Sequence, residues 1–166
     1  AAEGGNRVSQ IVRWPGRVAA GSRCDEPVTS TDFYPTLLEA AGLPLRPEQH
    51  VDGVSLLPLL TGQGSLSREA LFWHYPHDSN QGDSPACWII SGDWKLIEHF
   101  EDGRVELFDL HRDPTENDEC GGTNPQVRQR LHGLLKQWRV NIEAKVPQPN
   151  PDFPRQQPRV PNNAHV

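Results

Sequence analysis

Residues 68–110 read REALFWHYPHDSNQGDSPACWIISGDWKLIEHFEDGRVELFDL, and this stretch decides the fold. Its apolar segments are rich in the aromatic and β-branched residues that favour strands, and they lie at 70–73, 86–90, 94–100 and 105–110. Turn residues separate the last three segments: Ser91-Gly92-Asp93 and Asp102-Gly103. Asp-Gly is typical of a two-residue type I′ hairpin turn. The pattern therefore predicts a four-stranded antiparallel meander.

The segment after the predicted sheet has the pattern of an amphipathic helix. Asn124 suits the N-cap, and Pro125 suits the first turn, where its missing N–H costs little. Apolar residues then recur every three or four positions: Val127, Leu131, Leu134, Leu135, Trp138 and Ile142. We expect this face to cover the sheet, which predicts an α+β fold.

The first part of the chain holds one predicted strand and one predicted helix. Residues 8–14 (VSQIVRW) read as a strand that ends at a Pro-Gly pair. Since this strand would have an unpaired edge here, we expect it to belong to a larger sheet built by residues outside this chain. The helix is predicted from about Thr29, with Phe33 and Leu37 on an apolar face and Gly42 just past its end.

Composition limits the classes of partner. The 166 residues carry a net charge of −6 and a mean hydropathy of −0.66. No run of Lys and Arg is dense enough to follow a phosphate backbone, which argues against nucleic acid. No apolar run approaches the roughly 18 residues of a membrane span. Cys24, Cys87 and Cys120 leave an odd thiol and match no zinc motif. The absence of an initiator Met suggests a piece cut from a longer protein.

One loop, 74–85, gathers side chains of the kind that bind ligands: His74, His77, Asp78, Asn80, Gln81 and Asp83. Two histidines with nearby carboxylates can hold a metal ion, although Pro76 keeps the pair off a single helical turn. The imidazoles and amides equally suit the rim of a site for a hydroxylated or anionic small molecule. The third interpretation is a surface loop whose histidines cap the sheet.

Two further patterns predict no chemistry. The acidic run 113–119 lacks the alternating ligands and central glycine of an EF-hand, and we interpret it as a solvated face. No Gly-x-Ser-x-Gly nucleophile motif occurs. The residues alone therefore indicate an α+β domain and assign no reaction.

Several strings resemble, in order, those of one enzyme family. They are EGGNRV at 3–8, IVRWPG at 11–16, VTSTDFYPTLL at 28–38, DGVSLLPLL at 52–60, GDWKLI at 92–97 and ELFDL at 106–110. Together they resemble the sulfatases, the formylglycine-dependent sulfate-ester hydrolases of the alkaline phosphatase superfamily. Ser9 stands where that family usually has proline, a departure that should change little.

The resemblance implies the C-terminal portion of such an enzyme without its active centre. The family makes its formylglycine from a Cys/Ser-x-Pro-x-Arg motif, and no such motif occurs here. The family's calcium ligands, with their Asp-His-Gly passage, are also absent, and its sulfate-binding lysine would precede the EGG string. We therefore predict no catalytic residue and no metal ligand in this chain. Ca²⁺ and formylglycine are expected in an N-terminal catalytic portion, the chain's partner.

The resemblance also implies a domain division. Residues 1–64 would end the large α/β sulfatase domain, whose edge includes the predicted strand and helices. Residues 65–146 would form a small subdomain of antiparallel sheet plus helix, and 147–166 a Pro-rich extended tail.

The implied function of the intact enzyme is hydrolysis of sulfate esters of a sugar or an aryl group, at a periplasmic or secreted location. His74, His77 and Gln81 are then expected to bind substrate at the mouth of the cleft. One alternative is a non-catalytic carbohydrate-binding or interaction module. Another is a phospho- or phosphonate-ester hydrolase of the same superfamily.

Overall fold

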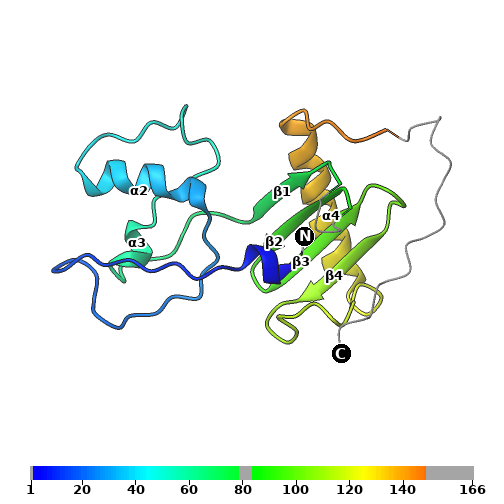
Figure 1. Ribbon diagram of the computed structural model, residues 1–166, viewed down its shortest axis with the longest axis horizontal. Coiled ribbons are helices and arrows are strands. Elements are labelled where there is room, and N and C mark those ends of the chain that lie inside the picture. Colours follow the sequence, from blue (N-terminus) through cyan, green and yellow to red (C-terminus); the bar gives the residue numbers. More distant parts are fainter. Residues whose placement is uncertain (1, 79–83, 149–166) are drawn as a thin grey trace.

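The computed structural model describes residues 2–78 and 84–148 of the chain (Figure 1). A four-stranded antiparallel sheet lies beside a smaller helical region. The elements, in chain order, are α1 (Glu3–Asn6), the 3₁₀ turn η1 (Ser30–Asp32), α2 (Phe33–Ala40), α3 (Leu57–Leu60), β1 (Leu71–Tyr75), β2 (Ala86–Ser91), β3 (Trp94–His99), β4 (Val105–Asp109) and α4 (Pro125–Asn141).

The sheet has the predicted meander order, β1-β2-β3-β4, with every neighbouring pair antiparallel. Ser91 pairs with Trp94 across a two-residue turn, in which Gly92 has φ 56° at the first central position. That geometry needs glycine and matches the twist of the flanking strands. The pairing makes Leu96 and Ile89 direct neighbours at the centre of the sheet.

The turn between β3 and β4 differs from the predicted two-residue type I′ turn. His99 N–H donates to the Arg104 carbonyl at 2.9 Å, so four residues form the loop. Gly103 has φ 71°, whereas Asp102 is not left-handed and its carboxylate instead accepts a hydrogen bond from Arg104 N–H at 2.9 Å. A type I′ turn needs positive φ at both central residues, and here a side-chain bond to the backbone favours the wider loop.

Helix α4 covers one face of the sheet, as its apolar spacing predicts (Figure 1). Leu131 and Leu135 are fully buried, and the Trp138 ring stacks on the Phe72 ring with centroids 5.0 Å apart. Burying one such leucine contributes about 1.5–3 kcal/mol. Ile142 lies just past the helix and is about half exposed, so the apolar face is one residue shorter than predicted.

The opposite face of the sheet carries a second apolar cluster, and α1 lies against this face (Figure 1). The cluster contains Trp88, Ile97 and Phe108, with the Trp73 ring stacked on the Trp88 ring at 5.8 Å. Because side chains alternate along a strand, both faces of this sheet are apolar, and each needs a cover. No helix of the described ranges is long and apolar enough to cross a membrane.

The helical region is organised by the buried carboxylate of Asp32. Its Oδ2 accepts a hydrogen bond from Thr29 N–H at 2.8 Å, and its Oδ1 accepts from Val54 N–H at 3.0 Å and from Arg68 Nη1 at 2.7 Å. One side chain therefore caps the predicted helix start and holds the segment before α3. Gly53 fits there because a Cβ would lie 2.1 Å from a backbone carbonyl oxygen.

Two expectations about the first part of the chain are wrong for this structure. Residues 8–14 form no strand, and Val8 and Ile11 are 80% and 92% exposed, because no neighbouring strand in the described ranges offers hydrogen bonds. The expected apolar face of α2 is also largely exposed, with Phe33 at 44% and Leu37 at 67%. The buried side of α2 is instead the one that carries Thr36, whose hydroxyl accepts a hydrogen bond from a backbone N–H near α3.

Candidate functional site

His74, the first predicted binding residue, lies on β1 and points to the side of the sheet that α4 covers. Its Nε2 donates a hydrogen bond to the Lys145 carbonyl at 2.9 Å, and its ring meets the Phe100 ring edge-on with centroids 5.6 Å apart. This bond requires a proton on Nε2, and Nδ1 is buried without a hydrogen-bond partner. His74 therefore ties β1 to the segment after α4.

His77, the second predicted binding residue, is exposed two positions after β1. Its ring meets Tyr75 edge-on with centroids 5.4 Å apart. Tyr75 and His74 are adjacent on β1 and so point to opposite faces, which gives the two histidines different surroundings. Gln81, the third predicted residue, lies outside the described residues. The substrate-binding role of these three residues stays a prediction.

A buried ionic triad joins the first residues of the chain to the sheet and to the acidic loop after it, and sequence reasoning missed it. Lys95 on β3 is fully buried, and its Nζ lies 2.8 Å from Glu3 Oε1 and 2.7 Å from Glu116 Oε1. Glu3 N–H also donates to Glu116 Oε2 at 2.7 Å. Glu116 has φ 58°, an uncommon conformation for a residue other than glycine. The triad therefore fixes α1 and the acidic loop on the same face of the sheet.

The acidic run 113–119 is only in part the solvated face that we expected: most of its residues are exposed, but Glu116 is not. Glu116 belongs to the triad, and the Glu119 carboxylate accepts hydrogen bonds from Leu107 N–H at 3.1 Å and Gly121 N–H at 2.7 Å. Hydrogen bonds from backbone N–H groups, chiefly that of Asp118, lower the pKa of the Asp113 carboxyl. These carboxylates thus contact Lys95 and the chain's own backbone.

The described side chains form no metal-binding cluster, and two of the three thiols are shielded. Within 2–78 and 84–148, no three His, Cys, Asp or Glu side chains are placed to hold a metal ion. The resemblance places the calcium ion in the N-terminal portion, outside this chain. Burial raises the pKa of Cys87 to about 12, and burial also raises that of Cys120. Both remain thiols at neutral pH, which are poor nucleophiles.

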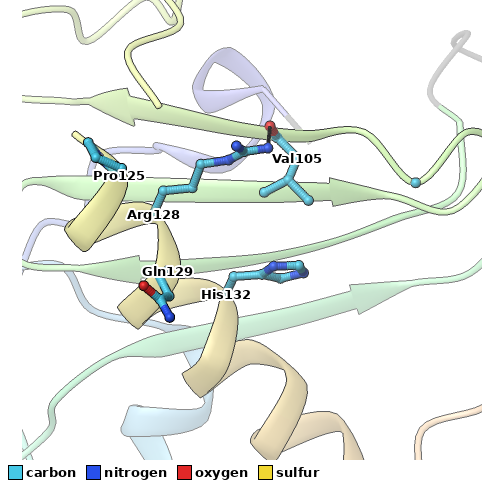
Figure 2. A pocket seen from close by; sticks show the side chains of 6 residues that line it. Val105, Pro125, Arg128, Gln129 and His132 are labelled. Atoms are coloured by element: carbon cyan, nitrogen blue, oxygen red, sulfur yellow. Dashed lines mark hydrogen bonds between the residues drawn. The ribbon is translucent and has the colours of Figure 1, made fainter. Parts of the chain in front are cut away.

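An open depression lies between α4 and the β3–β4 hairpin (Figure 2). On the hairpin side it is lined by Val105, and Arg128 Nη2 donates across it to the Val105 carbonyl at 3.2 Å. On the α4 side, Gln129 and His132 line it. His132 Nε2 lies 3.2 Å from Glu98 Oε2, and burial lowers the pKa of His132 despite the opposite effect of that carboxylate. The depression offers hydrogen-bond donors and no catalytic pair.

A known family model matches the part of the chain that forms this fold and these buried contacts. The family described as N-sulphoglucosamine sulphohydrolase, C-terminal, matches residues 2–141. This chain belongs to that family. The match includes the triad, the Asp32 contacts, the whole sheet and α4, so the family assignment rests on the same elements that hold the fold together.

Relatives of this sulphohydrolase C-terminal domain are sulfatases. A sulfatase from Formosa agariphila is 30% identical over 90% of this chain, and human arylsulfatase A is 34% identical over 87%. In each case the matched region is 32% of the relative, so the chain spans about a third of their length. These matches confirm the resemblance on which the predicted function depends.

A solved structure with the same fold is that of BT4656, in complex with its substrate D-glucosamine-2-N,6-O-disulfate. The TM-score is 0.63 and the identity 27%, over 80% of this chain and 28% of that chain. The four-stranded sheet with its C-terminal helix is therefore confirmed as a sulfatase C-terminal fold.

Proposed function

We propose that this chain is the C-terminal portion of a sulfatase, an enzyme that hydrolyses sulfate esters of a sugar or an aryl group. The observation that carries the proposal is the family match over residues 2–141, together with 34% identity to arylsulfatase A across 87% of the chain. The sequence has no Cys/Ser-x-Pro-x-Arg motif, and in this proposal the chain contributes structure and substrate contacts rather than the reacting groups.

The proposed division of labour is the one that the resemblance implies. Residues 1–64 belong to the end of a large α/β domain, and 65–146 form a small subdomain of sheet and helix. The exposed apolar side chains of 8–14 and α2 would be covered by the N-terminal catalytic portion, the partner of this chain. That portion would supply formylglycine and Ca²⁺, which provide the nucleophile and the charge stabilisation for sulfate transfer. Most of the segment 147–166, expected to be a Pro-rich extended tail, lies outside the described residues.

Substrate contacts are proposed at the loop after β1. His77 is exposed, and its imidazole can donate to a sulfate or hydroxyl oxygen. His74 lies three positions before His77 at the start of this loop, and Gln81 would add an amide from the same loop. BT4656, which shares the fold, is described with a disulfated glucosamine as its substrate, so a sulfated sugar is the substrate class that we favour. A periplasmic or secreted location agrees with such a substrate.

The proposal is tested with the full-length protein that carries this chain and, in parallel, with the chain alone. The full-length protein should release sulfate from p-nitrophenyl sulfate and from N- and O-sulfated glucosamine, and the chain alone should release none, even with added calcium. Faster hydrolysis of phosphate or phosphonate monoesters would reassign the enzyme within its superfamily. Turnover by the isolated chain would refute the division of labour, and binding of sugars without any hydrolysis would favour a carbohydrate-binding module.

The loop proposal needs a separate measurement. In the full-length enzyme, His77→Ala should raise KM for the sulfated sugar more than KM for p-nitrophenyl sulfate, because only the sugar extends to the loop. His74→Ala should do the same and also lower stability, since it removes the bond to Lys145. Equal effects on both substrates would remove the loop from the substrate site. His111→Ala, an exposed histidine outside the loop, is the matched control.

A further inference from the structure

The charge of α4 is opposite to that of the chain that contains it. The chain as a whole carries −6, yet residues 125–141 contain Arg128, Arg130, Lys136 and Arg139 and no Asp or Glu. A cationic helix on an acidic protein concentrates positive potential on one surface and attracts anions to it.

Helical geometry divides these cations between two flanks. Arg130 lies on the flank near β1, 3.6 Å from Glu69 Oε1. Arg128 and Arg139 lie on the other flank, next to the β3–β4 hairpin, because Arg128 donates to Val105 and Arg139 lies over the Phe100 ring at 5.5 Å. We call this second flank, defined by Arg128, His132, Lys136 and Arg139, the basic flank of α4.

Two depressions follow the basic flank from end to end. The first, which Figure 2 shows, is lined by Arg128 and His132, and the second by Lys136 and Arg139. With a rise of 1.5 Å per residue, Arg128 and Arg139 start about 16 Å apart along the helix, so the basic flank suits an extended ligand rather than a single ion.

Carboxylates oppose only part of this charge. Glu98 pairs with His132 at 3.2 Å and with Arg139 at 3.1 Å, and Glu143 lines the second depression. Arg128 and Lys136 are exposed, and neither forms an ion pair with another residue of the described ranges. These two cations remain available to anionic groups of a ligand.

We propose that the basic flank of α4 is a docking surface for a sulfated polysaccharide chain, separate from the loop after β1. Sulfate groups would pair with Arg128 and Lys136, and Gln129 would donate its amide to hydroxyl oxygens of the sugar. The choice of a sulfated glycan rests on the proposed sulfatase function, whereas the anion-binding property rests on the charges and depressions alone. Such a surface would hold a polymeric substrate on the enzyme.

The test measures binding of dextran sulfate to the 166-residue chain by calorimetry, without turnover. The double variant Arg128→Gln/Lys136→Gln should weaken binding about tenfold, since each exposed ion pair to the ligand is weak on its own. The control Arg23→Gln/Arg46→Gln makes the same change in net charge at exposed positions elsewhere and should weaken binding less than about twofold. Circular dichroism checks that both double variants fold. The single variant Lys136→Gln, at an exposed position, keeps the Arg128 bond to Val105, so any weakening that it causes does not come from loss of that bond.

The outcomes separate this proposal from the proposed function. Unsulfated dextran should not bind, and amide chemical shifts should move along α4 on addition of dextran sulfate. No binding of dextran sulfate, or equal weakening by both double variants, would overturn the docking surface without affecting the sulfatase assignment. Tighter binding of duplex DNA or of anionic phospholipid vesicles than of dextran sulfate would overturn the glycan as its ligand.

Discussion

Replacing Lys95 with methionine tests whether the buried triad holds α1 and the acidic loop on the sheet. Methionine has a similar length but no charge, so Lys95→Met leaves the Glu3 and Glu116 carboxylates buried beside each other without their cation. Removing one partner of a buried ion pair typically costs about 3–5 kcal/mol, because the remaining charge is desolvated and uncompensated. Small domains have a total stability of about 5–15 kcal/mol, so the variant should lose a large part of it.

The free energy of unfolding is measured by urea denaturation at pH 7, followed by tryptophan fluorescence and by circular dichroism, which must give one transition. Lys136→Met is the matched control: it removes the same charge at an exposed position and should change stability by less than about 0.5 kcal/mol. Glu116→Gln should cost less than Lys95→Met, because Lys95 then keeps Glu3 as its partner. A loss below about 1 kcal/mol for Lys95→Met would refute the reasoning, since it would mean that water already solvates the carboxylates.

The remaining predictions concern backbone space, acid stability and thiol reactivity. Gly53→Ala should cost about 1–3 kcal/mol because its Cβ would meet a backbone carbonyl, whereas Gly133→Ala, with open space in mid-helix, should gain about 0.5–1 kcal/mol in urea denaturation. The lowered pKa of Asp113 contributes stability above its unfolded pKa and loses it as pH falls through the folded value; Asp113→Asn should therefore flatten the stability profile below about pH 4. Ellman's reagent should label exposed Cys24 in the native state and buried Cys87 only after unfolding.

The elements that depend on local patterns could be predicted from the sequence. The aromatic and β-branched segments of the sheet, the Ser91-Gly92-Asp93 turn and the apolar spacing of α4 each act within a few residues, and the structure confirms all three. The strand expected at 8–14 failed for a different reason. A strand needs a partner, and none lies within the described ranges, so β propensity alone leaves Ile11 exposed. The predicted domain division stays a prediction.

The candidate site was less accessible to sequence reasoning because its contacts join distant residues. Glu3 and Lys95 are 92 positions apart, and no local pattern predicts that they meet. The basic flank of α4 was missed because Arg128, Lys136 and Arg139 are spaced by several residues and form no dense run. Only the helical turn of 3.6 residues places them side by side. A charge count restricted to one flank of the predicted helix would have found it.

The strings that resemble the sulfatase family have structural roles in this chain. They therefore indicate the family to which the chain belongs, but they do not indicate a substrate. Glu3, Lys95, Asp32 and Gly53 all lie in those strings, and each is buried against atoms of the chain itself. A change at any of them would lower stability before it altered which ester is bound. Under the proposed function, any contribution of this chain to substrate choice would come from exposed positions outside the strings, where a side chain can change without loss of the fold. His77 in the loop after β1 and Lys136 on the basic flank of α4 are two such positions, since both side chains are exposed.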